Sequence, residues 1–214
     1  MFSAPLARWT TPDPLADKYY STSPYAFCNN NPVNFVDPDG NKLYFAAGVS
    51  EAFKQKFAAV VQFMNEKGTA GDLATLEASD FTYFIAEAKI EEGWNKFSKK
   101  SSTIYWDPDH IAESDEKIWI SPATILAHES AHAVEYDQAK HTNTIKELAS
   151  NKSKIEDKII TTTEQIAAQK HGEIDSDQVT RTKHSGQIVK IDISQKSVKE
   201  IQEIVRSHNQ ALKK

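Results

Sequence analysis

Two histidines and a glutamate in the middle of the chain have the spacing of a metal site. His128 and His132 are four positions apart, Glu129 directly follows the first, and the neighbouring residues are small or apolar. Because an α-helix turns once every 3.6 residues, both imidazoles would project from one face and could occupy two corners of a tetrahedral zinc site. Glu129 would lie beside the metal, where its carboxylate can take a proton from a zinc-bound water. This HExxH pattern predicts metal-assisted hydrolysis.

A catalytic zinc needs a third protein ligand, and the sequence offers several carboxylates for it. A continuation with a glycine and a third histidine after His132 is absent. Glu135 and Asp137 continue the same helix, which directs them away from a metal shared by the two histidines, and Asp137 would at most support a ligand. A glutamate from a later helix is therefore expected. The carboxylates C-terminal to the motif are Glu135, Asp137, Glu147, Glu156, Asp157 and Glu164.

The HExxH pattern could also occur by chance in an ordinary exposed helix with polar neighbours at i and i+4. Two observations favour the metal site. The residues that flank the motif are uncharged, as expected for a buried helix in which an unpaired charge would be unfavourable. Residues 103–108 form a β-prone run upstream of the motif, in the place where zincins have the edge strand that pairs with an extended substrate.

The periodicity of the chain predicts the elements that would position these residues. Ser50 is a helix N-cap before apolar residues at helical spacing, and Gly68 ends that helix. Ser121 and Pro122 begin the helix that carries the motif, which continues to about Lys140. Further helices are predicted at residues 144–160, 163–170 and 197–211, and strands at residues 42–45, 81–85, 103–106, 117–120 and 188–193. This order of elements predicts an α+β fold.

The segment downstream of the motif resembles a family of metalloprotease effectors. The stretch IEDKIITTTE at residues 155–164, followed by GE at 172–173 and RTKHSG at 181–186, is similar to the pattern EExRVIxGxE, GE and RxxH/Y of type III secreted host-cleaving proteases. More remotely it is similar to botulinum-type neurotoxin light chains. The resemblance implies a zincin-like domain with an active-site helix, a small sheet and a downstream ligand helix. It also implies that Glu156 is the third zinc ligand and that Arg181 and His184 form the RxxY-like pair.

The departures from that family leave alternatives open. The chain differs from the pattern at Ile155, Thr162 and His184. A cation opposite the metal would stabilise negative charge on the carbonyl oxygen, but Arg181 and His184 could also belong to a basic loop. Glu164 is the alternative third ligand, or a helix N-terminal charge beside the hydroxyls of residues 161–163. The remaining histidines have no partner spacing and are expected at the surface: His110, His141, His171 and His208.

The first 41 residues differ in amino-acid composition from the rest of the chain. Six of the eight prolines precede Gly40, among several aromatic residues and the run Cys28-Asn29-Asn30-Asn31. This density of turn formers prevents a long helix and predicts an extended segment at residues 1–41 and a second unit at residues 42–214. Residues 5–41 resemble the C-terminal end of the Rhs/YD-repeat core, with its SPYxYxxNNP stretch and DPxG turn. The resemblance implies that residues 42–214 are a polymorphic toxin carried by a parent Rhs cage, delivered into a target cell as part of a larger exported protein and neutralised by a cognate immunity protein.

The composition of the chain argues against several other classes of function. A net charge of −5 argues against nucleic-acid binding through phosphate contacts, and a single Cys28 excludes a disulfide framework and a cysteine-based zinc cluster such as that of the deaminases. No run approaches the roughly 18 apolar residues of a membrane span, and no signal-peptide pattern opens the sequence. The leading hypothesis is a zinc-dependent endopeptidase toxin that acts on a target-cell protein. Its Zn²⁺ ligands would be His128, His132 and Glu156, and its catalytic residues Glu129, Arg181 and His184. The alternative is a non-catalytic binding or capping module of an Rhs protein.

Overall fold

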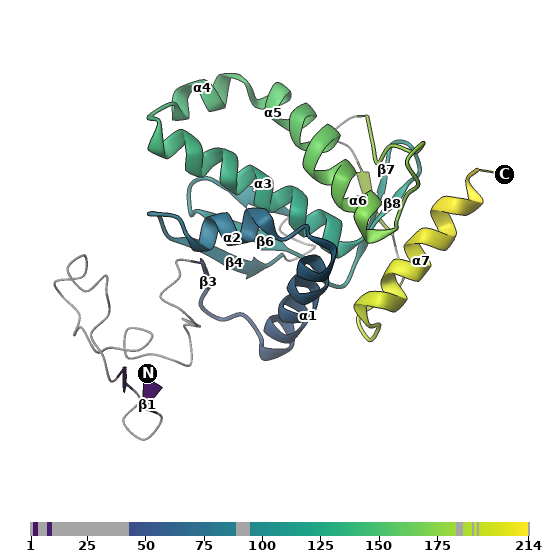
Figure 1. The fold of residues 1–214 in the computed structure, drawn as a ribbon, viewed down its shortest axis with the longest axis horizontal. Coiled ribbons are helices and arrows are strands. Elements are labelled where there is room, and N and C mark those ends of the chain that lie inside the picture. The colour runs from purple at the N-terminus through teal and green to yellow at the C-terminus, as the bar shows by residue number, and fades with distance from the viewer. Residues whose placement is uncertain are drawn as a thin grey trace.

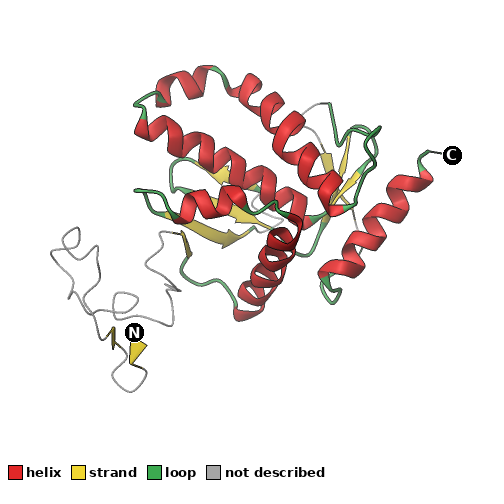
Figure 2. Ribbon diagram, viewed as in Figure 1, coloured by secondary structure: helices red, strands yellow, loops and turns green. Residues whose placement is uncertain are grey.

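The computed structural model describes residues 2–3, 8–9, 43–88, 95–182, 186–189, 191 and 193–213. Helices and strands are mixed along these residues in an α+β fold, as the sequence predicts (Figures 1 and 2). Of residues 1–41, the structure describes only the short antiparallel strands β1 (Phe2–Ser3) and β2 (Arg8–Trp9), so the segment that resembles the Rhs core lies outside the described residues except for β2. His184 lies outside them as well. None of the described helices is long and apolar enough to cross a membrane.

A four-stranded sheet forms one layer of the fold. Its strands are ordered β3 (Leu43–Phe45), β4 (Tyr83–Glu87), β6 (Thr103–Trp106) and β5 (Lys96–Ser98), with β3, β4 and β6 parallel and β5 antiparallel. Ile85 and Ile104 are register partners, and both are buried. Apolar runs of this kind are typical of parallel strands that are covered by helices.

The expectation that residues 103–106 form an edge strand is wrong. These residues form β6, which lies between β4 and β5 inside the sheet. The reason is visible in its burial: Ile104 and Trp106 are inaccessible to solvent, and the indole Nε1 of Trp106 donates a 2.8 Å hydrogen bond to the carbonyl of Pro122. Within the described strands, the antiparallel edge is β5, which the sequence did not predict.

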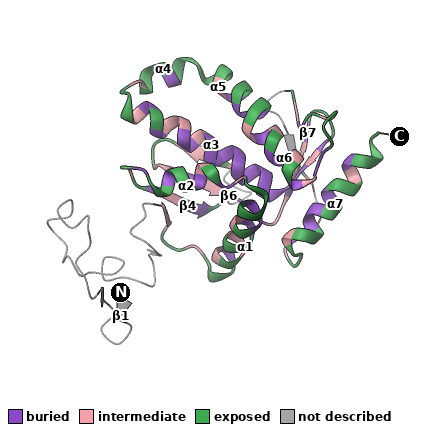
Figure 3. Ribbon diagram, viewed as in Figure 1, coloured by how far each residue is buried: buried purple, intermediate pink, exposed green. Residues whose placement is uncertain are grey.

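The helix that carries the HExxH motif, α3 (Pro122–His141), runs through the middle of the fold (Figure 3). The hydroxyl of Ser121 caps its N-terminus by accepting from the backbone of Thr124, and Pro122 occupies the first turn, as predicted. One side of α3 packs on the sheet and on α2 (Gly71–Glu77), and α1 (Glu51–Lys67) also contacts it. Because its neighbours surround it, α3 is buried through most of its length.

A nearly continuous helical arm covers the other side of α3 (Figure 1). It consists of α4 (Ile145–Ser150), α5 (Lys152–Ile159), the π-helical turn η5 (Ile160–Glu164) and α6 (Gln165–His171). The sequence predicts a helix break near residue 161, but the structure continues through η5 and breaks at Asn151 instead. Gly172 ends the arm with a φ of 79°, a left-handed conformation that suits glycine.

A second, smaller sheet packs against the C-terminal helix. Its antiparallel order is β8 (Trp119–Ile120), β7 (Ile111–Ser114) and β9 (Gly186–Val189), and α7 (Val198–Ala211) packs against β8. The strand predicted at residues 188–193 thus begins earlier and ends at Val189. A Ser197 and Glu200 capping box starts α7, and the ring of His208 stacks on Trp119 at 3.8 Å.

A buried polar cluster fixes the N-terminus of α3 against α6 and α7. The carboxylate of Glu173 accepts hydrogen bonds from the Ser121 hydroxyl at 2.5 Å and the Thr124 hydroxyl at 2.6 Å, and Gln202 of α7 donates to Ser121 at 2.8 Å. His171 bonds to Thr124 at 2.8 Å and is buried, so its expected place at the surface is wrong. The negative carboxylate also lies at the end of α3 where the helix dipole is positive.

Replacement of Glu173 by glutamine is expected to lower the free energy of unfolding by about 1–3 kcal/mol, because an amide cannot accept from all of these buried donors. Urea unfolding followed by circular dichroism measures the change. Glu203→Gln on the exposed face of α7 is the matched control and should stay within about 0.5 kcal/mol of the wild type. Equal stability of the two variants would show that Glu173 does not hold the helix in place.

Candidate metal centre

The two histidines of the motif face one another across one turn of α3. Their Nε2 atoms are 3.1 Å apart. His128 is almost inaccessible, with 2% of its side chain exposed, whereas His132 keeps 22% exposed. The pair therefore presents two nitrogen donors to a common point, which is open to solvent on the side of His132.

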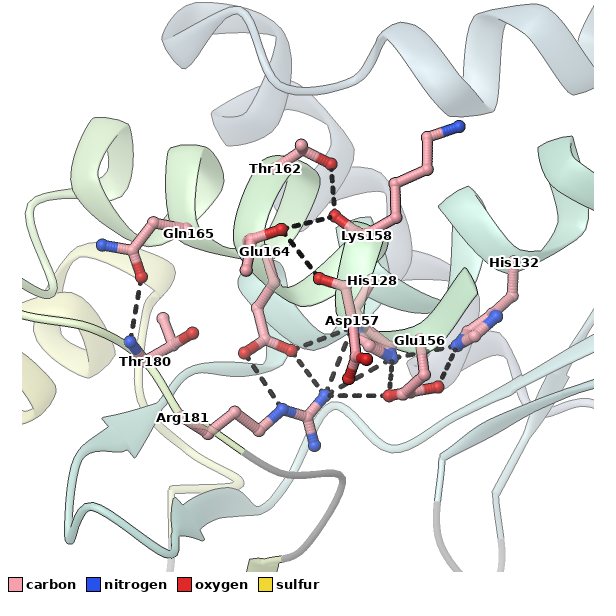
Figure 4. Close-up of polar contacts among 11 residues, drawn as sticks. His128, His132, Glu156, Asp157, Lys158, Thr162, Glu164, Gln165, Thr180 and Arg181 are labelled. Atoms are coloured by element: carbon pink, nitrogen blue, oxygen red, sulfur yellow. Dashed lines mark hydrogen bonds and ion pairs between the residues drawn. The ribbon is translucent and has the colours of Figure 1, made fainter. Parts of the chain in front are cut away.

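Glu156 reaches this point from α5. Its Oε1 lies 3.3 Å from Nε2 of His128 and its Oε2 lies 3.0 Å from Nε2 of His132 (Figure 4). Within the part of the chain that the structure describes, these three residues form the group whose ligand atoms lie close enough to hold a metal ion. The structure thus brings together the three residues that the sequence nominates as zinc ligands.

The other carboxylate candidates lie elsewhere. Asp137 is buried on another side of α3, where Tyr83 donates to it at 2.8 Å and Ser79 also bonds to it. Glu135 pairs with Lys158 at 2.5 Å. Glu147 and Asp157 are exposed. None of these four belongs to the group around His128 and His132.

The donor set and its dimensions fit zinc. A tetrahedral zinc with bonds of 2.0–2.1 Å separates its ligand atoms by about 3.3 Å, since the angle between them is near the tetrahedral value. The three contacts among the imidazoles and the carboxylate, 3.0–3.3 Å long, are close to this separation. Two imidazoles and one carboxylate leave a fourth position for water, which is the composition of a catalytic site.

Glu164 occupies a position that the sequence did not predict. Its Oε2 lies 2.9 Å from Nδ1 of His128, on the opposite edge of the ring from Glu156. A carboxylate on the second nitrogen of a ligand histidine fixes the orientation of the ring and leaves Nε2 available for a metal. Glu164 is therefore placed to support His128, and the group of donors that face the common point contains Glu156 instead.

Arg181 closes the site beside Glu164. Its Nε and Nη2 atoms bind the two carboxylate oxygens of Glu164 at 3.1 and 2.5 Å, and Nη2 lies 3.9 Å from Glu156 (Figure 4). The adjoining backbone is held as well, because the amide of Thr180 donates to Gln165 of α6 at 3.0 Å. The remaining terminal nitrogen, Nη1, makes no hydrogen bond to any described residue.

The carboxylates around His128 favour binding of positively charged groups. Burial acts against protonation of His128, but hydrogen bonds to Glu156 and Glu164 outweigh it and raise the pKa of the imidazole to about 9. Burial likewise acts against ionisation of Glu164, yet the neighbouring His128 and Arg181 hold the pKa of that carboxyl below its ordinary value. Negative charge is therefore stabilised in a buried place where a divalent cation would find anionic and imidazole donors together.

Glu129 follows His128 on the same helix and is buried, with 5% of its surface exposed. Among the described residues, no hydrogen bond or ion pair engages its carboxylate. A buried carboxylate without a partner is unfavourable unless water or a ligand satisfies it. The Glu129 carboxylate also acts electrostatically on His128, alongside the hydrogen bonds from Glu156 and Glu164.

His128, Glu129 and His132 on α3, Glu156 on α5 and Arg181 come from three separate segments. The His128, His132 and Glu156 donors could hold a metal ion, and an arginine lies beside them. The spacing within α3 predicts the alignment of the two histidines. Only the fold brings α5 and residue 181 next to them. Comparisons of the chain with protein-family models, curated proteins and solved structures give no match.

Proposed function

We propose that residues 42–214 are a zinc-dependent endopeptidase domain that hydrolyses a protein of a target cell. The observation that carries the proposal is the convergence of His128, His132 and Glu156 on one point, with dimensions that fit tetrahedral zinc. Glu129, a buried carboxylate without a described partner, lies on the same helix. Together these residues supply the ligands and the proton acceptor that hydrolysis of a peptide bond requires.

Each residue has a distinct role in this proposal. Bound zinc would polarise the substrate carbonyl and lower the pKa of a water molecule. Glu129 takes a proton from the attacking water on a carboxylate oxygen and passes it to the departing amine. Glu164 keeps His128 in the tautomer that carries its proton on Nδ1. Arg181 donates from Nη1 to the carbonyl oxygen as negative charge develops there.

Arg181→Ala is expected to lower the hydrolytic rate about 10²-fold, because it removes a donor to the developing oxyanion. Zinc content should remain at the level of the wild type, since the guanidinium is not a ligand. Rate and zinc content are measured on the same preparations, with Arg206→Ala on the exposed face of α7 as the control. A variant that loses its zinc together with its activity would show that Arg181 acts by holding the metal site together.

The toxin role rests on the resemblance of residues 5–41 to the Rhs core. It places this domain after the DPxG turn, where Rhs proteins carry their variable effectors. Under this proposal the parent Rhs cage delivers the domain in an exported protein, and the producing cell makes an immunity protein that blocks it. His184, from the RxxH segment, is proposed as a second donor near the carbonyl oxygen.

Purified protein is expected to contain one zinc ion per chain, because the donor set is preformed. A chelator should remove the ion and lower the melting temperature, since a metal that binds only the folded state stabilises it. In target cells, expression of the wild type should produce new protein termini. A non-catalytic binding or capping module would keep its stability in chelator and would bind a partner without cleaving it.

A further inference from the structure

The π-helical turn η5 connects the helix of Glu156 to the position of Glu164. The backbone N–H of Gln165 donates to the carbonyl of Ile160, five residues earlier, which defines the wider turn. We propose that this turn sets the phase of the helical arm so that Glu156 can bind the metal while Glu164 supports His128. The proposal deepens the zinc peptidase function proposed above and rests on it.

The phase of a regular helix would not bring both carboxylates to His128. Glu164 follows Glu156 by eight positions. In a continuous α-helix, eight residues rotate about 80° past two full turns. A π turn accommodates one extra residue. The rotation from Glu156 to Glu164 then equals that of seven residues in an α-helix, which is about 20° short of two full turns. Both side chains then lie along one line of the arm.

The observed contacts require this alignment. Glu156 lies 3.3 Å from Nε2 of His128 and Glu164 lies 2.9 Å from Nδ1, so two carboxylates of one helical arm bind opposite edges of one imidazole. Both carboxylates are buried, which leaves little room for either to reach the ring from another direction. A side chain rotated by about 80° around the arm would take its carboxylate away from that nitrogen of His128.

Two threonine hydroxyls hold the arm in this geometry. Thr161 donates to the carbonyl of Asp157 at 2.7 Å, and Thr162 donates to the carbonyl of Lys158 at 2.6 Å. Each hydroxyl donates to the carbonyl four residues earlier, in the turn that leads into η5, and side-chain bonds of this kind often bend a helix. The structure assigns Thr161 and Thr162 as positioning residues that act on the metal centre through Glu164.

The experiment changes the number of residues in the turn and measures metal binding directly. Deletion of Thr163 should convert the arm to a continuous α-helix with a spacing of seven, so its Zn²⁺ affinity should stay within about threefold of the wild type. Insertion of one alanine after Thr163 should rotate Glu164 away from His128 and lower the affinity about 10-fold or more, as loss of a supporting partner does. The absorption bands of bound Co²⁺ report the ligand geometry of each variant.

A substitution pair tests the hydroxyls without changing chain length. Thr161→Val with Thr162→Val should weaken Zn²⁺ binding about 3- to 10-fold, whereas Thr161→Ser with Thr162→Ser should restore it. Thermal unfolding of the metal-free proteins is measured in parallel. If the valine pair lowers stability but leaves the Co²⁺ spectrum and the Zn²⁺ affinity unchanged, the threonines have only a structural role and the proposal fails.

The outcomes distinguish a failure of the proposed role of η5 from a failure of the proposed zinc peptidase function. A wild type that takes up neither Zn²⁺ nor Co²⁺ would overturn both. A wild type that binds one ion per chain, with a deletion variant that loses it or an insertion variant that keeps it, would overturn the role of η5 alone. The proposal predicts that the deletion variant keeps its Zn²⁺ affinity and that the insertion variant loses it.

Discussion

Glu129→Gln is expected to reduce peptide hydrolysis by about 10²–10⁴-fold while leaving the bound zinc in place. An amide has nearly the shape of the carboxylate but cannot take a proton from water, so the change removes the base and spares the ligands. The measurement compares new protein termini in cells that express the wild type or the variant, together with the zinc content of both purified proteins. The toxicity of the chain should fall in parallel.

Glu135→Gln is the matched control for this change. It alters the same chemical group on the same helix, where Glu135 pairs with the solvent-exposed Lys158 and lies outside the donor group of the described residues. Its rate should equal that of the wild type. If Glu129→Gln leaves cleavage and toxicity intact, Glu129 is not the base and the proposed peptidase mechanism is wrong.

Removal of the third ligand should have the second large effect. Glu156→Ala is expected to weaken zinc binding by more than about 10²-fold, because even a supporting residue outside the ligand set contributes 10- to 100-fold. The stabilisation by zinc should disappear with it; for the wild type this amounts to about 4 kcal/mol at a zinc concentration 1,000 times Kd. Calorimetric titration and melting curves with and without zinc measure the two quantities.

Asp157→Ala tests whether the loss is specific to the ligand. Asp157 is the next residue of α5, but its side chain is exposed and lies outside the donor group. It should bind zinc like the wild type. If Glu156→Ala retains tight binding while Glu164→Ala loses it, the two glutamates have the opposite roles from those proposed.

Local patterns in the sequence predict the part of the site that lies within one helix. The four-residue spacing of His128 and His132 is enough to align them, because a single helical turn fixes their relation, and Ser121 with Pro122 marks where that helix begins. The α+β class follows from the order of helices and strands along the chain in the same way. These features depend on residues that are near one another in sequence.

The parts that the sequence did not reveal depend on distant contacts or on an irregular turn. The position of Glu164 could not be read from helical periodicity, since η5 departs from 3.6 residues per turn. The burial of His171 results from Glu173, Thr124 and the neighbouring helices, and no local spacing indicates it. The interior place of β6 likewise follows from pairing with β4 and β5, which are remote or weakly patterned strands.

The polar cluster at the start of α3 has a consequence for the order of events during synthesis. Ser121 is joined to Glu173 and to Gln202 of α7, so the helix with the histidines is anchored by residues that the ribosome adds much later. A chain that has emerged only as far as α6 contains all three proposed ligands but lacks the contacts of α7. Under the proposed function, we expect peptidase activity only after α7 has been made and has docked against Ser121.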